Sequence, residues 1–172
     1  AGLLTGALRS RFGIVHNLRF YDDNELTDIL VQAANKLENV NINRDALHTI
    51  ASRSRGTPRI ALRLLRRVRD YADVRCNGNF DADVVNAALT LEGIDEVGMD
   101  ALDRTYMETI AQTYEGGPVG VEAVAASMGE DAGTLQDVVE PYLLQVGFLA
   151  RTRIGRQITP KGLEWLKNSV TH

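Results

Sequence analysis

Residues 92–100 place two glycines and four carboxylates within nine positions, and they separate two series of helix signals. Glycines favour turns and carboxylates favour contact with water, so this segment is typical of a boundary between folding units. The chain of 172 residues is long enough for one domain or two small ones. We therefore expect two domains, over residues 21–95 and 96–172.

The first domain is predicted to contain four short helices. They are expected over about 22–38, from Asn43, from Thr57 and over about 81–91. Each has a polar N-cap residue, and Pro58 occupies the first helical position of the third, where its missing N–H costs nothing. The acidic run from Asp22 to Glu25 is interpreted as a helix cap and not as a metal site.

The second domain has a different pattern. Helices are expected over about 100–114, 120–128 and 131–145, the last with Leu135, Val138, Val139, Tyr142 and Leu143 inward. Residues 148–153 and 156–159 flank a tight turn, and Pro160 opens a final helix. Three helices, a hairpin and a closing helix describe a winged helix-turn-helix with a small β-hairpin wing. The fold class is therefore mainly α.

The net charge of −4 conceals a segregation of charge along the chain. Residues 1–80 carry 13 Lys and Arg against 8 Asp and Glu, residues 81–140 carry 1 against 14, and residues 141–172 carry 5 against 1. Two basic segments divided by an acidic one suggest two surfaces that face anions. A single cysteine, Cys76, cannot form an internal disulfide, and no apolar run or leader predicts a membrane span or secretion. A cytoplasmic protein is expected.

Seven arginines and no carboxylate lie between Arg53 and Arg69. On the third helix, the exposed members are expected to be Arg59, Arg63, Arg66 and Arg67. Such a face either binds phosphates or pairs with the acidic segment 81–140, and the residues alone leave both readings open. Arg59 lies in the first helical turn, where a helix end and a guanidinium can meet the same anion.

The predicted wing carries Arg151, Arg153 and Arg156, which suit the phosphates of duplex DNA. The helix before it contains acidic residues, Glu130, Asp131, Asp137 and Glu140, which the major groove would repel. We expect the wing to bind DNA with little sequence preference, or the domain to serve as a protein contact module. No nucleophile, metal-ligand or triad pattern completes an active site in this chain.

Four stretches of sequence closely resemble the RuvB family of AAA+ motors. They are residues 8–14, 53–70, 116–120 and 140–149. The resemblance covers nearly the whole chain and corresponds to the C-terminal half of the family: the end of the ATPase core over 1–20, the lid and the winged helix. It implies a subunit of a hexameric ring that uses ATP and Mg²⁺ to translocate duplex DNA, drives Holliday junction branch migration and works with RuvA and RuvC.

The resemblance also implies roles for individual residues. Arg11 is similar to the arginine finger that enters the neighbouring subunit's nucleotide site, and Arg59 to the sensor-2 arginine of the subunit's own site. Tyr21 and Pro58 match residues that line that site. Arg151 and Arg156 match DNA-contacting arginines, whereas Arg153-Ile154 replaces the family's usual Pro-Arg pair and Ala132 stands where an arginine is common.

Two other classes of protein remain as alternatives. One is a winged-helix transcriptional regulator with a helical dimerisation domain, which would prefer a defined operator and ignore nucleotide. The other is the lid and collar of a clamp-loader-like ATPase, which would not need a basic wing. A Gly-rich phosphate-binding loop upstream of the chain would favour an ATPase.

Overall fold

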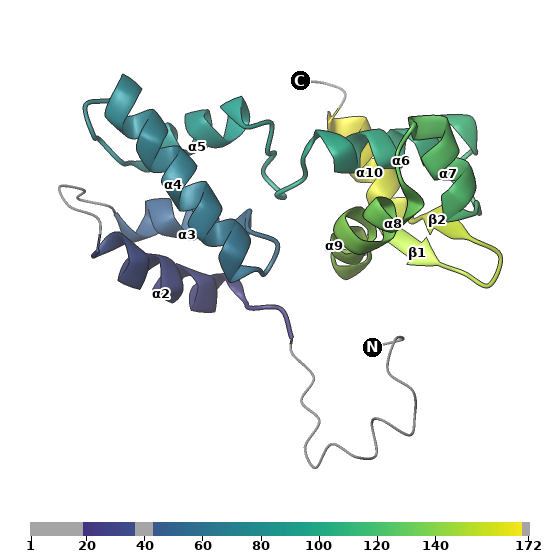
Figure 1. Cartoon of the computed structure of the whole chain (residues 1–172), viewed down its shortest axis with the longest axis horizontal. Helices are drawn as coiled ribbons and strands as arrows, with labels where there is room; N and C mark the ends of the chain where they lie inside the picture. The colour runs from purple at the N-terminus through teal and green to yellow at the C-terminus, as the bar shows by residue number, and fades with distance from the viewer. Residues whose placement is uncertain (1–18, 37–42, 170–172) are drawn as a thin grey trace, which may run out of the picture.

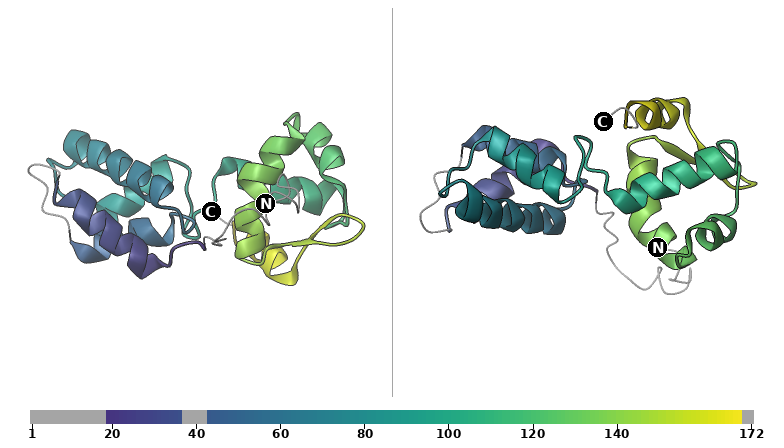
Figure 2. Two further views of the ribbon diagram at one scale, coloured as in Figure 1. Left: turned by 60° about the horizontal axis from the view of Figure 1, so that its bottom comes forward. Right: turned by 90° about the horizontal axis from the view of Figure 1, so that it is seen from above.

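The computed structural model describes residues 19–36 and 43–169. The fold is mainly helical, with a lid domain followed by a winged-helix domain that carries one antiparallel hairpin (Figure 1). Two groups of helices lie side by side in all views, joined by the segment after α5 (Figure 2). Arg11 and most of the expected end of the ATPase core, residues 1–18, lie outside the described residues.

The lid consists of α2 (Asp23–Ala34), α3 (Arg44–Ser52), α4 (Pro58–Arg75) and α5 (Ala82–Leu91). Asp22 and Glu25 form a reciprocal capping box at the start of α2, which confirms that the acidic run is a cap. Asn43 and Asp81 cap α3 and α5 with their side chains. The four helices bury one apolar cluster, which includes Leu26, Ile50, Leu64, Val68 and Leu89.

The winged-helix domain begins with α6 (Ala101–Thr113) and α7 (Val121–Met128). The hairpin is formed by β1 (Leu149–Arg151) and β2 (Arg156–Ile158), paired so that Leu149 faces Ile158 and Arg151 faces Arg156. Helix α10 (Pro160–Ser169) then closes the domain and stacks Trp165 on Phe148. A second apolar cluster fills the interior, with Met99, Tyr106, Leu143 and Trp165 among its members.

The expected single helix over 131–145 is wrong in its interior. The chain forms a short helix α8 (Ala132–Thr134), a π-helical turn η1 (Leu135–Val139) and a helix α9 (Glu140–Gln145). Pro141 explains the wider turn, because it has no N–H for the ladder and its ring would clash with the carbonyl four residues back. The prediction that Val138 faces inward is also wrong: its side chain is exposed, whereas Leu135, Val139 and Leu143 are buried.

Residues 92–100 are a folded turn and not an open linker. The Asp95 carboxylate accepts hydrogen bonds from the backbone N–H groups of Val97 and Met99, and the Trp165 indole donates to its other oxygen. Met99 is fully buried in the second cluster. Within the described residues, no helix has the length and apolar character that crossing a bilayer requires.

Candidate nucleotide and nucleic-acid interfaces

The start of α4 brings three of the predicted nucleotide residues together. Tyr21 donates its backbone N–H to the carbonyl of Gly56 at 2.9 Å, so the chain entering the lid lies against the turn that precedes Pro58 and Arg59. Gly56 has φ +65°, and a Cβ there would come within 2.7 Å of the Phe20 Cβ. This turn therefore requires glycine, both for its backbone conformation and for the close approach of Phe20.

The same helix end is open to an anion. Among residues 19–36 and 43–169, no side chain caps α4, because the Thr57 hydroxyl donates to the Arg55 carbonyl and does not accept from the helix. The unsatisfied N–H groups of the first turn and the helix dipole favour a negative charge there. The Arg59 side chain is exposed and forms no ion pair within the described ranges, and Tyr21, whose backbone contacts Gly56, is 45% exposed.

The exposed arginines of α4 are mostly without carboxylate partners. Arg67 lies 3.9 Å from Glu92, whereas Arg59, Arg63 and Arg66 form no ion pair in the described part of the chain. The sequence left open whether this face binds phosphates or pairs with the acidic segment 81–140. Among the described residues, pairing with that segment accounts only for Arg67. The other three guanidiniums stay available for an anion outside the described residues.

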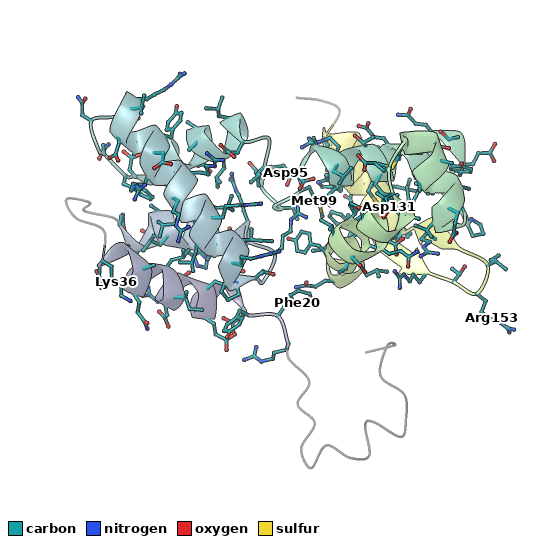
Figure 3. The ribbon with its side chains drawn as sticks, viewed as in Figure 1. Phe20, Lys36, Asp95, Met99, Asp131 and Arg153 are labelled. Carbon is teal, nitrogen blue, oxygen red and sulfur yellow. The ribbon has the colours of Figure 1, made fainter. Side chains whose placement is uncertain are left out.

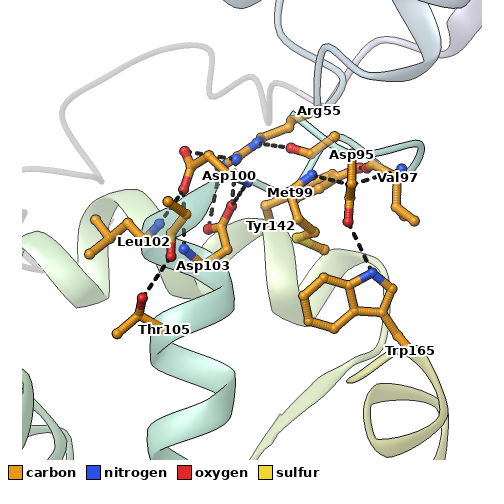
Figure 4. Close-up of polar contacts among 12 residues, drawn as sticks. Arg55, Asp95, Val97, Met99, Asp100, Leu102, Asp103, Thr105, Tyr142 and Trp165 are labelled. Carbon is orange, nitrogen blue, oxygen red and sulfur yellow. Dashed lines mark hydrogen bonds and ion pairs between the residues drawn. The ribbon is translucent and has the colours of Figure 1, made fainter. Parts of the chain in front are cut away.

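Arg55 instead joins the lid to the winged helix (Figure 4). Its guanidinium donates to the Gly98 carbonyl at 2.8 Å and to the carboxylates of Asp100 and Asp103, and it lies over the Tyr142 ring. The side chain of Arg55 is only 12% exposed and that of Asp103 only 1%. Burial raises the pKa of Asp103 to about 6, against the attraction of Arg55, so this carboxylate is ionised at neutral pH.

The base of the wing is organised by a carboxylate that the solvent does not reach. Glu140, at the start of α9, accepts hydrogen bonds from Arg151, Arg156 and the Tyr106 hydroxyl and is 0% exposed. Burial opposes its ionisation, but the hydrogen bonds from Arg156, Arg151 and Tyr106 outweigh that effect and hold the pKa of Glu140 below its usual value. Glu140 is therefore a buried, paired carboxylate and not one of the exposed acidic residues of this segment.

The three wing arginines differ in what they can reach. The Arg156 side chain is 17% exposed and points into the Glu140 cluster, whereas Arg151 is 48% exposed and keeps part of its guanidinium in water. Arg153 lies at the tip of the turn, directed away from the domain (Figure 3), and has no partner within the described residues. Ile154 beside it is 77% exposed.

The shape of the wing tip is fixed by Thr152. Its hydroxyl donates to the carbonyl of Gly155 and accepts from the N–H groups of Ile154 and Gly155. These hydrogen bonds shape the turn in which Arg153 and Ile154 are exposed. The tip is thus a preformed, partly apolar and positively charged contact.

Comparison with known proteins matches both domains to one family. The RuvB AAA lid domain matches residues 21–95, and the RuvB C-terminal winged helix domain matches residues 96–167. The chain belongs to the RuvB family. This assignment rests on the matches of two adjacent domains, which together span residues 21–167, and not on a single motif.

Solved structures agree with this assignment. The RuvB Holliday junction branch migration motor of Thermotoga maritima is 50% identical, with a TM-score of 0.90 over 96% of this chain. A variant of that Thermotoga RuvB is 49% identical with the same TM-score. The chain spans 55% of the length of these RuvB proteins.

Within this RuvB-family chain, sequence reasoning missed two arrangements. The Arg55–Asp103 pair joins residues 48 positions apart, and the Glu140 cluster joins a helix to a hairpin. The signal for Arg55 was its place among arginines without local carboxylates. For Glu140, the signal was a carboxylate directly before a proline in an otherwise apolar helix face.

Proposed function

We propose that this chain acts as part of a RuvB motor subunit, which uses ATP hydrolysis in a hexameric ring to translocate duplex DNA and drive branch migration at Holliday junctions. In this proposal, residues 1–20 end the ATPase core, 21–95 form the lid and 96–172 bind DNA. The four-way junction, RuvA and RuvC are its partners, and the cytoplasm is its compartment. The observation that carries the proposal is the uncapped, arginine-bearing start of α4 beside Tyr21, within a lid of the RuvB family.

The described residues fit the phosphate end of a nucleotide. Arg59 and the free N–H groups of α4 would hold a phosphate, while Tyr21 and Pro58 would border the nucleotide. ATP supplies the energy of phosphoryl transfer, and guanidinium donors near its terminal phosphate neutralise charge that develops in the transition state. Arg11, outside the described residues, is proposed to supply such a donor to the neighbouring subunit. No group of metal-ligating side chains occurs in the described residues. Mg²⁺, like ATP, is proposed as a cofactor of the full-length motor.

The proposed DNA contact is made by the wing and through phosphates. Arg153 and Arg151 offer accessible guanidiniums, whereas Arg156 is proposed to act mainly by holding the hairpin on Glu140 while its remaining N–H groups face the backbone. Glu130 and Asp131 are exposed acidic residues directly before α8. They disfavour insertion of the helical segment that runs from α8 to α9 into the major groove. Affinity should therefore depend on salt and hardly on sequence.

The alternative is a winged-helix transcriptional regulator with a helical dimerisation domain. The match of residues 21–95 to a RuvB lid disfavours it, because a regulator has no need of an AAA+ lid. The two functions predict opposite binding behaviour, since a regulator discriminates among sequences.

A salt titration of DNA binding tests the proposal. Arg153→Ala should weaken binding to duplexes of any sequence alike and reduce the slope of log K against log salt by about 0.9. Arg44→Ala, which removes an exposed lid arginine paired with Asp28, is the matched control and should change neither quantity. Fluorescence anisotropy with several unrelated duplexes measures both. A loss confined to one duplex sequence would contradict the motor and favour the regulator.

A further inference from the structure

The lid and the winged-helix domain have separate apolar cores. Ile94 packs against the first cluster and Val97 against the second, so the chain passes from one core to the other between these two residues. Beside this crossing, an open cleft of about 850 Å³ lies between α5 and α10, with Asn86 on one side and Trp165 on the other. Domains that share no apolar core change their relative orientation unless another contact fixes it.

The contact that crosses between the domains is centred on Arg55. Its guanidinium, which belongs to the lid, donates to the Gly98 carbonyl and to the carboxylates of Asp100 and Asp103 (Figure 4). It also lies over the Tyr142 ring, 5.2 Å from the centroid. A planar fork of donors suits several acceptors at once, so one buried side chain binds three separate points of the winged-helix domain.

Both sides of this contact are held in place within their own domains. On the lid side, Ser54 is fully buried and its hydroxyl donates to the Ile50 carbonyl, which fixes the turn that carries Arg55. On the other side, the Tyr142 hydroxyl donates to the Val97 carbonyl at 2.6 Å, which fixes the segment leading to Gly98. The guanidinium therefore connects two rigid parts.

The backbone of Arg55 has a conformation that favours glycine. Its φ is +54°, in the left-handed region, and the following residue, Gly56, has φ +65°. A long side chain in this region costs free energy that glycine would not cost. Residues held in such a conformation are candidates for a functional role. The contacts of the guanidinium with the winged-helix domain give a reason for an arginine at this position.

We propose that Arg55 is a positioning residue that makes the lid and the winged-helix domain move as one body in the motor. This inference rests on the proposed function, because that function supplies the movement to be transmitted. A rotation of the lid that follows nucleotide binding at the start of α4 displaces Arg153 at the wing tip only if the two domains keep their relative orientation. With Arg55 removed, the lid still responds to nucleotide but the wing does not follow.

The joint itself is tested on the whole 172-residue chain with residual dipolar couplings measured by NMR. In the wild-type chain, one alignment tensor should fit the amide couplings of both domains. In Arg55→Gln, two different tensors should be needed, because each charge-assisted hydrogen bond lost lowers the population of the joined arrangement about tenfold. Arg67→Gln is the matched control and should keep one tensor, since Arg67 is an exposed arginine of α4 whose neighbour Glu92 lies at the end of α5, within the lid.

A double variant separates loss of the joint from loss of the fold. Arg55→Gln alone leaves the buried Asp103 carboxylate without its guanidinium, which destabilises the winged-helix domain. Combining it with Asp103→Asn removes both charges, and Trp165 fluorescence checks that the domain is folded. Two tensors in the folded double variant support the joint. One tensor in that variant, two tensors in the wild-type chain, or two in Arg67→Gln would each refute it.

Transmission is tested by placing the same variants in a complete, ring-forming motor subunit. The double variant should hydrolyse ATP at the wild-type rate but move a synthetic four-way junction about tenfold more slowly or less, the factor expected for one lost charge-assisted hydrogen bond. Equal losses of ATP hydrolysis and junction movement, or junction movement at the wild-type rate, would refute the role of Arg55 in transmission. A wild-type subunit that moves no junction would overturn the proposed function and the transmission, while a single tensor in the wild-type chain would still support the joint.

Discussion

Replacing Glu140 by glutamine should destabilise the winged-helix domain by about 3 kcal/mol. The side chain keeps its shape but loses the charge that faces Arg151, Arg156 and the Tyr106 hydroxyl. Removing one partner of a buried ion pair typically costs roughly 3–5 kcal/mol, since the remaining charge stays buried. The lower end of that range applies because Arg151 is 48% exposed and can turn toward water, whereas Arg156 cannot.

Urea denaturation measures this change with one intrinsic probe. Trp165 is the only tryptophan of the chain, and it is packed in the winged-helix core, so its fluorescence reports unfolding of that domain. Glu130→Gln is the matched control: it removes an exposed carboxylate of the same domain and should change stability by less than about 0.5 kcal/mol. A loss below about 1 kcal/mol for Glu140→Gln would refute the reasoning that the cluster stabilises the wing base.

Two further perturbations test the junction of the domains. The folded chain holds the Asp103 proton more tightly than the unfolded chain, because the pKa of Asp103 is raised from 3.8 to about 6. This carboxyl should therefore lower stability by about 2 kcal/mol as the pH rises from 4 to 6, and urea midpoints of wild type and Asp103→Asn should diverge across that window; parallel curves would refute the assignment. Gly98→Ala places a Cβ 2.7 Å from the Arg53 carbonyl, whereas Gly93→Ala has open space at a similar positive φ. Thermal unfolding should show the former to be less stable by about 1–3 kcal/mol, and equal melting temperatures would contradict a close approach there.

The sequence predicted most of the fold because its signals are local. Polar caps and glycines set the helix ends, and the capping box of Asp22 and Glu25 lies within four consecutive residues. The hairpin and the closing helix have equally local signatures. The π-helical turn was missed because apolar spacing over 131–145 suggested one helix, although Pro141 already argued against an unbroken ladder.

The site was predictable only to a degree. The exposure of Arg59 and its place in the first turn of α4 followed from helical spacing. The structure adds that the Tyr21 backbone bonds to Gly56, in the turn that precedes this helix. Pairings such as Arg55 with Asp103 depend on how the two domains pack against each other, and residue spacing within the sequence does not predict that packing. Similarly, Glu140 appeared to be one more acidic residue on a helix until its burial was known.

The attachment of the wing has a mechanical consequence. The two strands of the hairpin have three residues each. If a load is applied at Arg153, they alone would resist separation only weakly, because the few backbone hydrogen bonds between them can break one after another. Arg151 and Arg156 face each other across the hairpin, and both are fastened to the same carboxylate at the start of α9. A pull on the tip is therefore shared by both strands and passed into the helical body, so the hairpin can serve as a stiff lever.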